Sequence, residues 1–347
     1  MKRVKVAVAG ASGYTGQELI RILLRHRGAE LVCATSRQYA GRRLGEVFPR
    51  FRQAPGAELP FTDSDVRAIA ATGAEAAFLA LPHGVSSSYA RGLVDAGVKV
   101  IDLSADFRLN DPAVYEEYYG KAHPDPGLLK EAVYGMPEWR SGEIRTARII
   151  ASPGCYPTSI LLPLIPLLRA GLLRTKGIVV NSASGVTGAG RKADISLLFC
   201  ECNESMRAYG IPKHRHLSEI EQELGAAAGE AVRISFTPHL VPLNSGICTT
   251  ISAELREGAD PALVGRALEE AYARAPFVRL LGRNACPDTK NVSRTNFVDI
   301  GWAWDERTGR VLLLSAEDNV VKGAGGQGVH AFNVLFGFDE TEGLWIL

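Results

Sequence analysis

Cys155 is the residue whose surroundings best suit covalent chemistry. It stands in Ser152-Pro-Gly-Cys-Tyr-Pro-Thr158, where an apolar run ends in a Pro-Gly turn and Pro157 suits the first turn of a helix. A thiol at a helix N-terminus meets N–H donors and positive partial charge, which favour the thiolate that a covalent catalyst needs. We therefore interpret Cys155 as a nucleophile. The alternative, a structural cysteine, better fits the apolar or strand-like contexts of Cys33, Cys248 and Cys286.

His214 and His216 are the candidates for an acid/base partner. They stand in the basic run Lys213-His-Arg-His216, ahead of a helix that Ser218 and Glu221 would open as a capping box. A cationic cluster before a helix N-terminus suits an anionic substrate and proton transfer. The residues leave open which histidine acts, and a basic surface turn is the alternative.

Cys200 and Cys202 raise the question of a metal site, because they lie shortly before the two histidines. Zinc-binding cysteines are commonly separated by about two to four residues. Only one residue separates this pair. We therefore predict no metal site.

A glycine-rich turn follows the first expected strand, 4–9, and opens the first expected helix. Its GxxGxxG spacing allows a sharp turn and close approach to a pyrophosphate, which a helix N-terminus attracts. Thr15 and Glu18 also fit a capping box for that helix. A tight turn without ligand is the alternative. The predicted cofactor residues of this turn are Gly10, Ser12, Gly13, Tyr14, Thr15 and Gly16.

The second expected strand, 31–34, leads into Thr35-Ser-Arg37. NAD enzymes usually carry a carboxylate here for the ribose 2′-hydroxyl. Two hydroxyls and a guanidinium instead suit a 2′-phosphate, because Arg binds phosphate with a fork of donors. We therefore predict NADP(H), bound by Ser36 and Arg37, rather than NAD. The alternative is that Arg37 is a solvated loop residue.

Three other segments lie at the ends of expected strands. Gly185 and Gly188 could wrap a phosphate or the nicotinamide, and Asn319 could present an amide to the nicotinamide. Arg108, after the strand expected at 98–103, offers an anion-binding guanidinium. For each segment, a turn without a ligand is the alternative.

The elements that must position these residues fall into two parts. A chain of 347 residues with 46% apolar content predicts two domains. Strand–helix alternation up to residue 151 predicts a Rossmann-type parallel sheet, with residues 1–152 as the dinucleotide-binding domain. Longer alternating runs afterwards predict an α+β catalytic domain over 153–324, with a mixed, largely antiparallel sheet. A C-terminal helix, 325–347, is expected to return to the first domain.

Charge and hydropathy exclude several classes of function. A formal net charge of +1 provides no basic field for nucleic acid or an anionic membrane. The first apolar run ends at Gly10, too early for a signal peptide, and no run approaches the about 20 apolar residues of a membrane span. We therefore expect a cytoplasmic protein with reduced thiols and with neither nucleic acid nor membrane as a partner.

Taken in order, these motifs resemble the N-acetyl-γ-glutamyl-phosphate reductase family of the semialdehyde dehydrogenase group. The resemblance spans nearly the whole chain. It includes the glycine-rich turn Gly10–Gly16 and the cysteine segment Ser152–Thr158. The other segments that carry it are Leu81-Pro-His-Gly84, Asp102-Leu-Ser-Ala-Asp-Phe-Arg108, His214-Arg-His216 with Glu219, and Asn319-Val-Val-Lys-Gly323.

The resemblance implies NADPH-dependent reduction of N-acetyl-γ-glutamyl phosphate to a semialdehyde in arginine biosynthesis. Cys155 would displace inorganic phosphate to give a thioester, which hydride would then reduce. One histidine of the pair would be the acid/base, with a preference for His216. The second domain would also serve dimerisation, in a homo-oligomer that is a dimer or a tetramer. Substrate binding would fall to Arg108, Arg191 and Glu219.

Other activities compete with this interpretation. A sister reductase, acting on carrier-bound aminoadipyl phosphate in lysine biosynthesis, has similar motifs, although the segment around Cys155 favours the arginine-pathway form. Aspartate semialdehyde dehydrogenase fits the His214-Arg-His216 arrangement poorly. A non-catalytic NADP sensor would need neither the cysteine nor the histidines.

Overall fold

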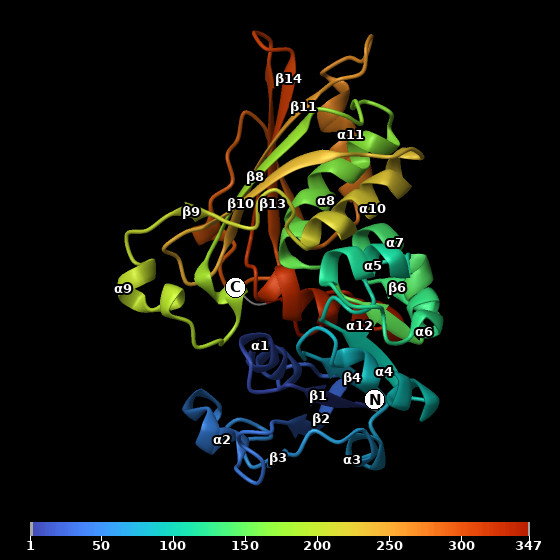
Figure 1. The fold of residues 1–347 in the computed structure, drawn as a ribbon, viewed down its shortest axis with the longest axis vertical. Helices are drawn as coiled ribbons and strands as arrows, with labels where there is room; N and C mark the ends of the chain where they lie inside the picture. The colour runs from blue at the N-terminus through green and yellow to red at the C-terminus, as the bar shows by residue number, and fades with distance from the viewer. Residues whose placement is uncertain (1–2, 346–347) are drawn as a thin grey trace. The chain divides into compact units, whose positions relative to one another are not determined.

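The computed structural model describes residues 3–345, which divide into two compact units. The first unit comprises residues 3–153 and 324–345, and the second comprises 154–323 (Figure 1). The boundaries expected from the sequence, after 152 and after 324, lie beside these divisions. Residues 1–2 and 346–347 of the expected domains lie outside the described residues.

The first unit contains a seven-stranded sheet in the order β3-β2-β1-β4-β5-β7-β6. All the strand pairings of this sheet among the described residues are parallel, which confirms the Rossmann-type prediction. The order reverses between β1 and β4, and open α/β sheets bind ligands beyond the carboxyl ends of their strands at such a point. The strands are β1 Val4–Ala9, β2 Ala29–Thr35, β3 Phe61–Thr62, β4 Ala76–Leu79, β5 Lys99–Asp102, β6 Val133–Tyr134 and β7 Ile149–Ala151.

Two of the helices in this unit begin at clear sequence signals. Asp111 and Asp125 are N-caps that accept from backbone N–H groups, and each precedes a proline that begins a helix. The capping box expected at Thr15 and Glu18 is wrong: Gly13 is the N-cap, and Glu18 pairs with Arg21. The helices are α1 Tyr14–Leu23, α2 Leu44–Val47, α3 Val66–Ala71, α4 Ser86–Asp95, α5 Pro112–Tyr119, α6 Pro126–Glu131, α7 Pro137–Ile144 and α12 Gly326–Phe336, with a 3-10 turn at Pro49–Phe51.

The C-terminal helix is shorter than expected. Helix α12 ends at Phe336, because Gly337 takes the left-handed conformation (φ 72°) that commonly stops a helix. The prediction of helix over 325–347 is therefore wrong for 337–345, and 346–347 lie outside the described residues.

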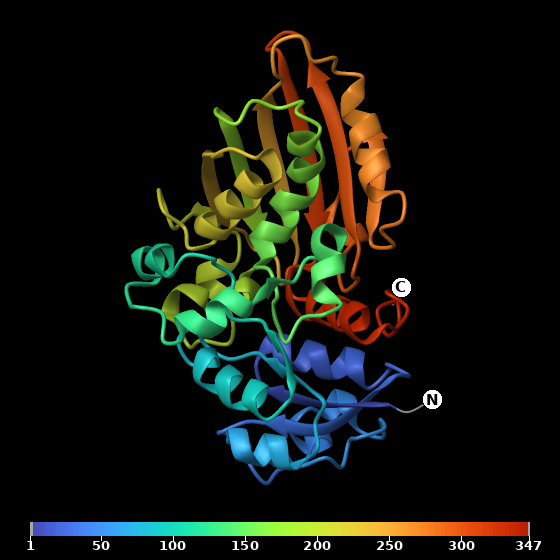
Figure 2. The same cartoon turned by 90° about the vertical axis from the view of Figure 1, so that its right-hand side faces the viewer.

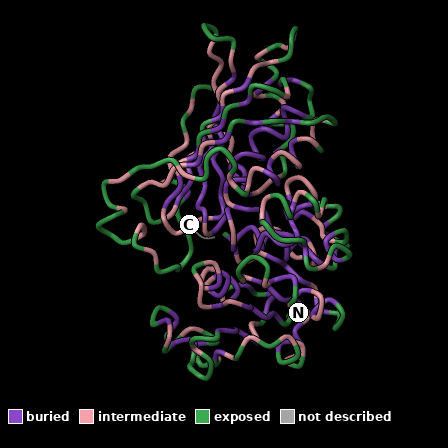
Figure 3. The backbone as a smooth tube through the Cα atoms, viewed as in Figure 1, coloured by how far each residue is buried: buried purple, intermediate pink, exposed green. Residues whose placement is uncertain are grey.

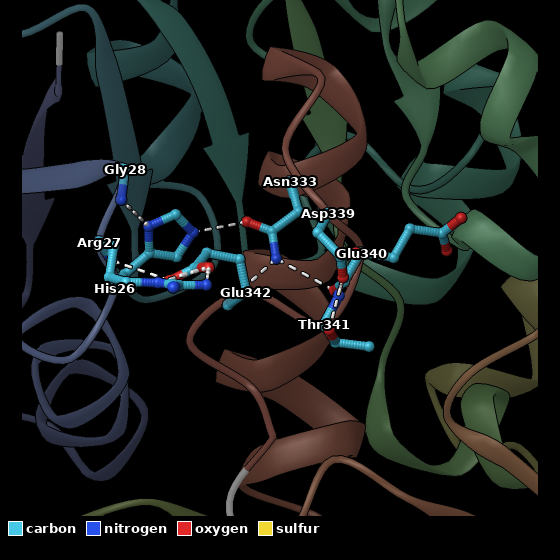
Figure 4. A network of polar contacts seen from close by, with 8 residues as sticks. All are labelled: His26, Arg27, Gly28, Asn333, Asp339, Glu340, Thr341 and Glu342. Atoms are coloured by element: carbon cyan, nitrogen blue, oxygen red, sulfur yellow. Dashed lines mark hydrogen bonds and ion pairs between the residues drawn. The ribbon is translucent and has the colours of Figure 1, made fainter. Parts of the chain in front are cut away.

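Polar contacts fasten the segment after α12 to the loop between α1 and β2 (Figure 4). The Nε2 atom of His26 lies 2.7 Å from Oδ1 of Asn333, whose Nδ2 donates to the carbonyls of Glu340 and Glu342 at 3.1 and 2.9 Å. Arg27 also pairs with the carboxylate of Glu342. Burial lowers the pKa of His26, which keeps this imidazole neutral inside the network.

The second unit contains a seven-stranded sheet in the order β12-β13-β14-β11-β8-β10-β9. The β8–β10 and β12–β13 pairs are parallel and the other four are antiparallel, so the predicted mixed, largely antiparallel sheet is confirmed. The strands are β8 Ile178–Ser184, β9 Arg207–Ala208, β10 Ile234–Leu240, β11 Ile247–Glu254, β12 Val278–Arg283, β13 Val298–Asp305 and β14 Arg310–Glu317.

Three helices cover one face of this sheet, as Figure 2 shows: α8 Cys155–Arg169, α10 His216–Ala228 and α11 Leu263–Tyr272. The other elements are the short helix α9 Phe199–Cys202, 3-10 turns at Val186–Ala189 (η2), Ile195–Leu197 (η3) and Thr289–Asn291 (η4), and a π-helical turn at Val321–Gly325 (η5). Helix α8 is central, because it packs against β11, β14, α10 and α11.

Two prolines inside α8 explain how this buried helix is held. Pro163 and Pro166 have no N–H, so the carbonyls of Ser159 and Leu162 lose their usual helical donors. The Ser315 hydroxyl on β14 donates to the Ser159 carbonyl at 2.7 Å. The Tyr272 hydroxyl on α11 donates to the Leu162 carbonyl. Both buried acceptors are therefore satisfied, and the helix carrying Cys155 is tied to the sheet and to α11.

Candidate active site

Cys155 is the first residue of α8, as predicted, and its thiol is half-buried. Gly154 is the N-cap in extended conformation, with no side-chain cap bond, so Cys155 stands at a helix N-terminus that its own N-cap side chain does not cover. The backbone of η5 packs against this position. A Cβ built on Gly323 would lie 2.7 Å from the Cβ of Cys155 and 2.8 Å from Oε1 of Glu317, so only glycine fits there.

Glu219 connects the cysteine's helix to the histidines. Its side chain is buried, and Oε2 accepts from the backbone N–H of Gly154 at 3.3 Å. Its Oε1 lies 4.0 Å from Nε2 of His216. One carboxylate thus contacts both the residue preceding Cys155 and the imidazole of His216.

Helix α10 begins three residues earlier than the sequence indicates. His216 is its first residue, and the capping box expected at Ser218 and Glu221 is wrong. The Ser218 hydroxyl donates to the carbonyl of Arg215 at 2.9 Å, and Glu221 pairs with Arg233. Because His216 lies in the first turn of the helix, Glu219 falls one turn later on the same face.

His214 has a different environment from His216. Its Nδ1 accepts from the backbone N–H of His216 at 3.1 Å, which leaves the ring proton on Nε2. Burial, with a further contribution from Arg215, lowers the pKa of His214 to about 4, so its imidazole is neutral near pH 7. The ring makes edge contacts, with centroids 5.5 to 5.6 Å away, with Tyr156, Tyr209 and Phe236.

Two tyrosines complete this cluster, and the sequence analysis missed both. The hydroxyls of Tyr156 and Tyr209 lie 2.7 Å apart. Burial raises the pKa of Tyr156 well above its usual range and that of Tyr209 to about 12, so both phenols keep their protons. Tyr156 directly follows the cysteine, whereas no local signal marks Tyr209.

The glycine-rich turn after β1 packs too tightly for side chains at two positions. Gly10 has φ 76°, and a Cβ there would lie 2.2 Å from the carbonyl oxygen of Ala80. A Cβ on Gly16 would lie 2.4 Å from the carbonyl oxygen of Gly10. Gly13 is the N-cap of α1, Tyr14 and Thr15 begin the helix, and Tyr14 is exposed.

The carboxyl end of β2 lies against this turn. Thr35, which is fully buried, accepts with Oγ1 from the backbone N–H of Gly10 at 3.3 Å. The Ser36 hydroxyl donates to the Ser12 hydroxyl at 3.0 Å, and Arg37 follows as an exposed side chain. The glycine-rich turn and the end of β2, both predicted to bind the cofactor, thus lie side by side. Thr35 and Ser36 each make one hydrogen bond between them.

The loop after β8 and the segment after β14 also meet. Asn319 is buried, its Oδ1 accepts from Gly246 N–H at 2.7 Å, and its Nδ2 donates to Oγ1 of Thr187 at 3.0 Å. Gly185 N–H donates to the carbonyl of Gly246 at 2.9 Å. A Cβ on Gly188 would lie 3.5 Å from Nδ2 of Asn319. The three predicted residues Gly185, Gly188 and Asn319 thus form one cluster in the second unit.

The two candidate anion-binding arginines differ in burial. Arg108 is buried in the first unit, where Nε donates to the carbonyl of Ser152 at 2.8 Å and Nη2 to that of Leu103 at 2.9 Å. These carbonyls follow β7 and β5, so Arg108 lies at the carboxyl ends of the strands. Arg191 belongs to the second unit and is exposed in the turn after η2.

Comparison with known proteins places the chain in a family. Residues 5–147 match the model described as semialdehyde dehydrogenase, NAD binding domain, and residues 155–319 match semialdehyde dehydrogenase, dimerisation domain. The N-acetyl-gamma-glutamyl-phosphate reductase of Akkermansia muciniphila is 75% identical over 100% of both chains. The chain belongs to the N-acetyl-gamma-glutamyl-phosphate reductase family. The family member of Desulfotalea psychrophila is 48% identical over 99% of each chain.

A solved structure with a different name shares the fold of this chain. The aspartate semialdehyde dehydrogenase II of Vibrio cholerae, in complex with ASA, has a TM-score of 0.71 over 97% of this chain and 99% of its own. The identity is 18%, so this similarity concerns the fold alone. The family resemblance derived from the motifs is thus confirmed, with an NAD(P)-binding domain in the first part of the chain.

Two kinds of feature are absent from the described residues. Within 3–345, no group of three or more His, Cys, Asp and Glu side chains is arranged to hold a metal ion. No helix in the same range is long and apolar enough to cross a bilayer.

Proposed function

We propose that this chain catalyses the NADPH-dependent reduction of N-acetyl-γ-glutamyl phosphate to N-acetyl-glutamate 5-semialdehyde and inorganic phosphate, a step of arginine biosynthesis. Relatives named for this activity match the chain over essentially its full length. The observation that carries the proposal is the buried carboxylate of Glu219, which contacts both Gly154, beside Cys155, and His216. A candidate nucleophile and a candidate acid/base are thereby connected through one side chain.

In the proposed reaction, the sulfur of Cys155 attacks the acyl carbon, the bond to the phosphate oxygen breaks, and a thioester forms. His216 takes the proton of the Cys155 thiol and gives it to the departing phosphate. NADPH, when bound, supplies the hydride that reduces the thioester carbon. The carbon–sulfur bond of the resulting thiohemiacetal anion then breaks, which releases the semialdehyde and leaves a Cys155 thiolate. This thiolate takes up a proton from water through His216, which restores the thiol for the next turnover.

We assign the acid/base role to His216 rather than His214. A base with a pKa of about 4 has little affinity for a proton near pH 7, and burial gives His214 such a pKa. His216 faces the carboxylate of Glu219, which would stabilise its protonated form. Glu219, which the resemblance puts at the substrate, is in this proposal a positioning residue for His216.

The proposed cofactor is NADP(H) rather than NAD, because the 2′-phosphate would meet Ser36 and the exposed Arg37 just beyond β2. The switch point between β1 and β4 lies beside these residues and supports a cofactor site there. The pyrophosphate would lie on the turn Gly10, Ser12, Gly13, Tyr14, Thr15 and Gly16, and the nicotinamide on Gly185, Gly188 and Asn319.

We further propose that Arg108 and Arg191 bind the anionic groups of the substrate. The buried guanidinium of Arg108 lies at the sheet edge where open α/β folds bind ligands. The protein would act as a homo-oligomer in the cytoplasm, where thiols such as Cys155 stay reduced.

The test is an assay in the direction of semialdehyde oxidation. The purified chain is given N-acetyl-glutamate 5-semialdehyde, inorganic phosphate and either NADP+ or NAD+, and nicotinamide reduction is followed by absorbance. We expect phosphate-dependent turnover that is faster with NADP+. Binding of NADP+ without turnover would instead identify a sensor. Faster turnover of carrier-bound aminoadipate semialdehyde would identify the lysine-pathway sister.

A further inference from the structure

Residues 102–109, which lead from β5 towards α5, form a connection that lies inside the first unit. Connecting segments usually run over the surface, because buried backbone needs hydrogen-bond partners. Here residues 104–109 are all buried, the class drawn in purple in Figure 3. The carboxylates of Asp102 and Asp106 are fully buried, and Arg108 is buried after them. Charged side chains are seldom buried without specific contacts, so the contacts of this 102–109 segment indicate what it does.

The carboxylate of Asp106 binds the start of helix α4. Its Oδ1 accepts from the backbone N–H of Gly84 at 2.8 Å, and its Oδ2 accepts from that of Ser87 at 3.0 Å. The N-cap of α4 is Val85, whose side chain makes no capping hydrogen bond. Asp106 therefore caps α4 from another segment of the chain, and the positive partial charge of the helix N-terminus stabilises its carboxylate.

The same residue is also held from α5 and from the loop that follows it. The hydroxyl of Tyr115 on α5 donates to Oδ1 of Asp106 at 3.2 Å, and Nε2 of His123 lies 2.6 Å from the carbonyl oxygen of Asp106. The backbone N–H of Asp106 donates to Oγ of Ser104 at 3.1 Å. Both the side chain and the backbone of Asp106 are therefore bound, which fixes the 102–109 segment against α4 and α5.

Asp102 fixes the beginning of the segment. Its Oδ2 accepts from the hydroxyl of Ser104 at 2.7 Å, and its Oδ1 accepts from the backbone N–H of Ser104 at 3.1 Å. The hydroxyl of Ser86, the first residue of α4, also donates to Oδ1. Burial, with a further contribution from Asp106, raises the pKa of Asp102 to about 6. The two carboxylates are thus close enough to influence each other, and both bind the start of α4.

Arg108 follows Asp106 by two residues, and neutral acceptors orient its guanidinium. Nε donates to the carbonyl of Ser152 at 2.8 Å, and Nη2 donates to that of Leu103 at 2.9 Å. Leu103 stands between the anchored residues Asp102 and Ser104, so the guanidinium is held by the same fixed backbone. A carbonyl carries no net charge, and these two bonds therefore orient the guanidinium without neutralising it.

We propose that Asp106 is a positioning residue for Arg108. Asp106 holds the 102–109 segment against α4 and α5, and the segment keeps the guanidinium at the carboxyl ends of β5 and β7. Open α/β sheets bind their ligands at this edge, so the guanidinium is oriented for an anionic group of the substrate. The identity of that substrate rests on the proposed function.

An amide does not replace the carboxylate of Asp106. Both of its oxygens accept from backbone N–H groups, which cannot reverse, so the NH2 group of an asparagine would face one of these donors. In the assay of semialdehyde oxidation, Arg108→Lys first identifies which KM, for the semialdehyde or for phosphate, depends on the guanidinium. We expect Asp106→Asn to raise the same KM at least about fivefold and to leave kcat and the NADP+ dissociation constant within about threefold. An unchanged KM, or an increase in a KM that Arg108→Lys leaves unchanged, overturns the proposal.

The double variant tests whether Asp106 acts through Arg108. In the Arg108→Lys background, Asp106→Asn should change the KM by less than about twofold, because the guanidinium that it positions is already absent. Effects that multiply would show that Asp106 contributes independently, and would reject the positioning role.

Two other Asp→Asn variants provide the comparison. Two serine hydroxyls are among the partners of Asp102, and hydroxyls can donate or accept, so Asp102→Asn should raise the KM less than Asp106→Asn does. An equal increase would assign the effect to buried charge rather than to the cap on α4. Asp65→Asn is the control, because Asp65 caps α3 through a single oxygen that asparagine retains. Its kinetic constants should match those of the unaltered chain.

Stability is checked by urea unfolding, because Asp106→Asn leaves a buried N–H group without its acceptor. Tyr115→Phe is the milder variant, since it removes only one hydroxyl donor to Asp106. If Asp106→Asn does not fold, Tyr115→Phe decides: it should raise the same KM about twofold, and an unchanged KM rejects the proposal.

A binding measurement separates this inference from the proposed function. Calorimetry follows the binding of inorganic phosphate and of N-acetyl-glutamate to the unaltered chain, Asp106→Asn and Arg108→Lys. We expect both variants to weaken binding of the same anion. An inactive chain whose anion binding depends on both residues would contradict the proposed function and leave this inference intact. An active chain in which Asp106→Asn changes neither anion binding nor KM would contradict this inference alone.

Discussion

The turns before α1 and α8 have the same backbone design but carry different groups. In each, a strand leads to a glycine N-cap in extended conformation, Gly13 (φ −73°, ψ 170°) or Gly154 (φ −69°, ψ 161°). Neither glycine has a side-chain cap, and neither helix has an acidic residue in its first turn. The positive partial charge of the two helix N-termini is therefore comparable.

The difference lies in what the chain supplies at each helix start. At α8, the N–H of Gly154 donates to the protein's own carboxylate, Glu219, and the first helical residue is a thiol. At α1, the turn presents backbone and the hydroxyl of Ser12, which Ser36 contacts. Under the proposed function, one turn geometry would serve covalent chemistry where a thiol and a carboxylate are built in. The same geometry would serve binding of an outside anion where they are not.

The largest expected effect is at the thiol. Cys155→Ser should lower turnover at least about 1,000-fold, because the hydroxyl is a far weaker nucleophile, while NADPH affinity stays within about threefold. Steady-state kinetics and fluorescence titration of NADPH measure the two effects. Cys286→Ser, at an exposed cysteine, is the matched control and should keep full activity. Substantial turnover by Cys155→Ser would remove the thioester from the mechanism.

The next effect separates the two histidines. His216→Gln should lower kcat about 100-fold through loss of proton transfer, whereas His214→Gln should cause a smaller loss, because His214 acts only by positioning. The pH profile of kcat should lose its histidine limb in His216→Gln and keep it in His214→Gln. The reverse pattern would exchange the two roles.

The turn before α1 should be sensitive to a single methyl group. Gly10→Ala should lower the free energy of unfolding by about 2 kcal/mol or more, because strain at positive φ is added to the contact with Ala80. Gly41→Ala is the control, since Gly41 also has positive φ (84°) but nothing within 4 Å of a Cβ. Urea unfolding of both variants measures the difference. Equal losses would mean that the close packing of the turn contributes nothing.

A smaller effect concerns the form of the cofactor. Arg37→Asp should weaken NADPH binding about tenfold and NADH binding much less, because it replaces a phosphate-binding group with a repelling charge. Titration of each reduced cofactor tests this, with Arg42→Asp, at another exposed arginine, as the control. Equal weakening of both cofactors would exclude Arg37 from the 2′-phosphate site.

The last prediction concerns stability and is confined to acid conditions. The unfolded chain protonates His214 near pH 6.5, whereas burial lowers its pKa in the folded chain to about 4. Stability should therefore fall as pH drops through this window, by at most about 1.4 kcal/mol per pH unit, and be unaffected by His214 above it. His214→Gln lacks this titration, so it should lose less stability than the wild type between about pH 6.5 and pH 4. Parallel losses in urea unfolding would show that His214 is protonated in the folded state.

Local patterns predicted the elements well where one periodicity dominates. Apolar runs located β1 and β7, and the Pro-Gly turn located the start of α8 at Cys155. Both expected capping boxes failed, because Gly13 and Arg215 precede the helices and the acidic partners pair with arginines instead. The helices α5 to α7 were missed, although Asp111 and Asp125 before prolines are clear signals for two of them.

The sequence predicted which residue types form the candidate site, but not the contacts between them. Glu219 and Gly154 lie 65 positions apart, and no spacing rule connects them. The distinction between His214 and His216 depends on three aromatic rings that bury His214 and thereby lower its pKa. Two of them, Tyr156 and Phe236, come from other elements of the unit. Tertiary packing, rather than local sequence, decides these properties.

The prolines of α8 have a mechanical consequence for Cys155. The carbonyls of Ser159 and Leu162 receive no helical hydrogen bond from Pro163 and Pro166, which lack an N–H, and each accepts an outside hydroxyl instead. The Ser159 carbonyl is therefore bound to β14 and the Leu162 carbonyl to α11. The helix can neither slide along its axis nor rotate without breaking one of these two hydrogen bonds. The position of Cys155 is therefore fixed relative to β14 and α11. The anchoring of Cys155, the proposed nucleophile, thus originates in two residues that usually break helices.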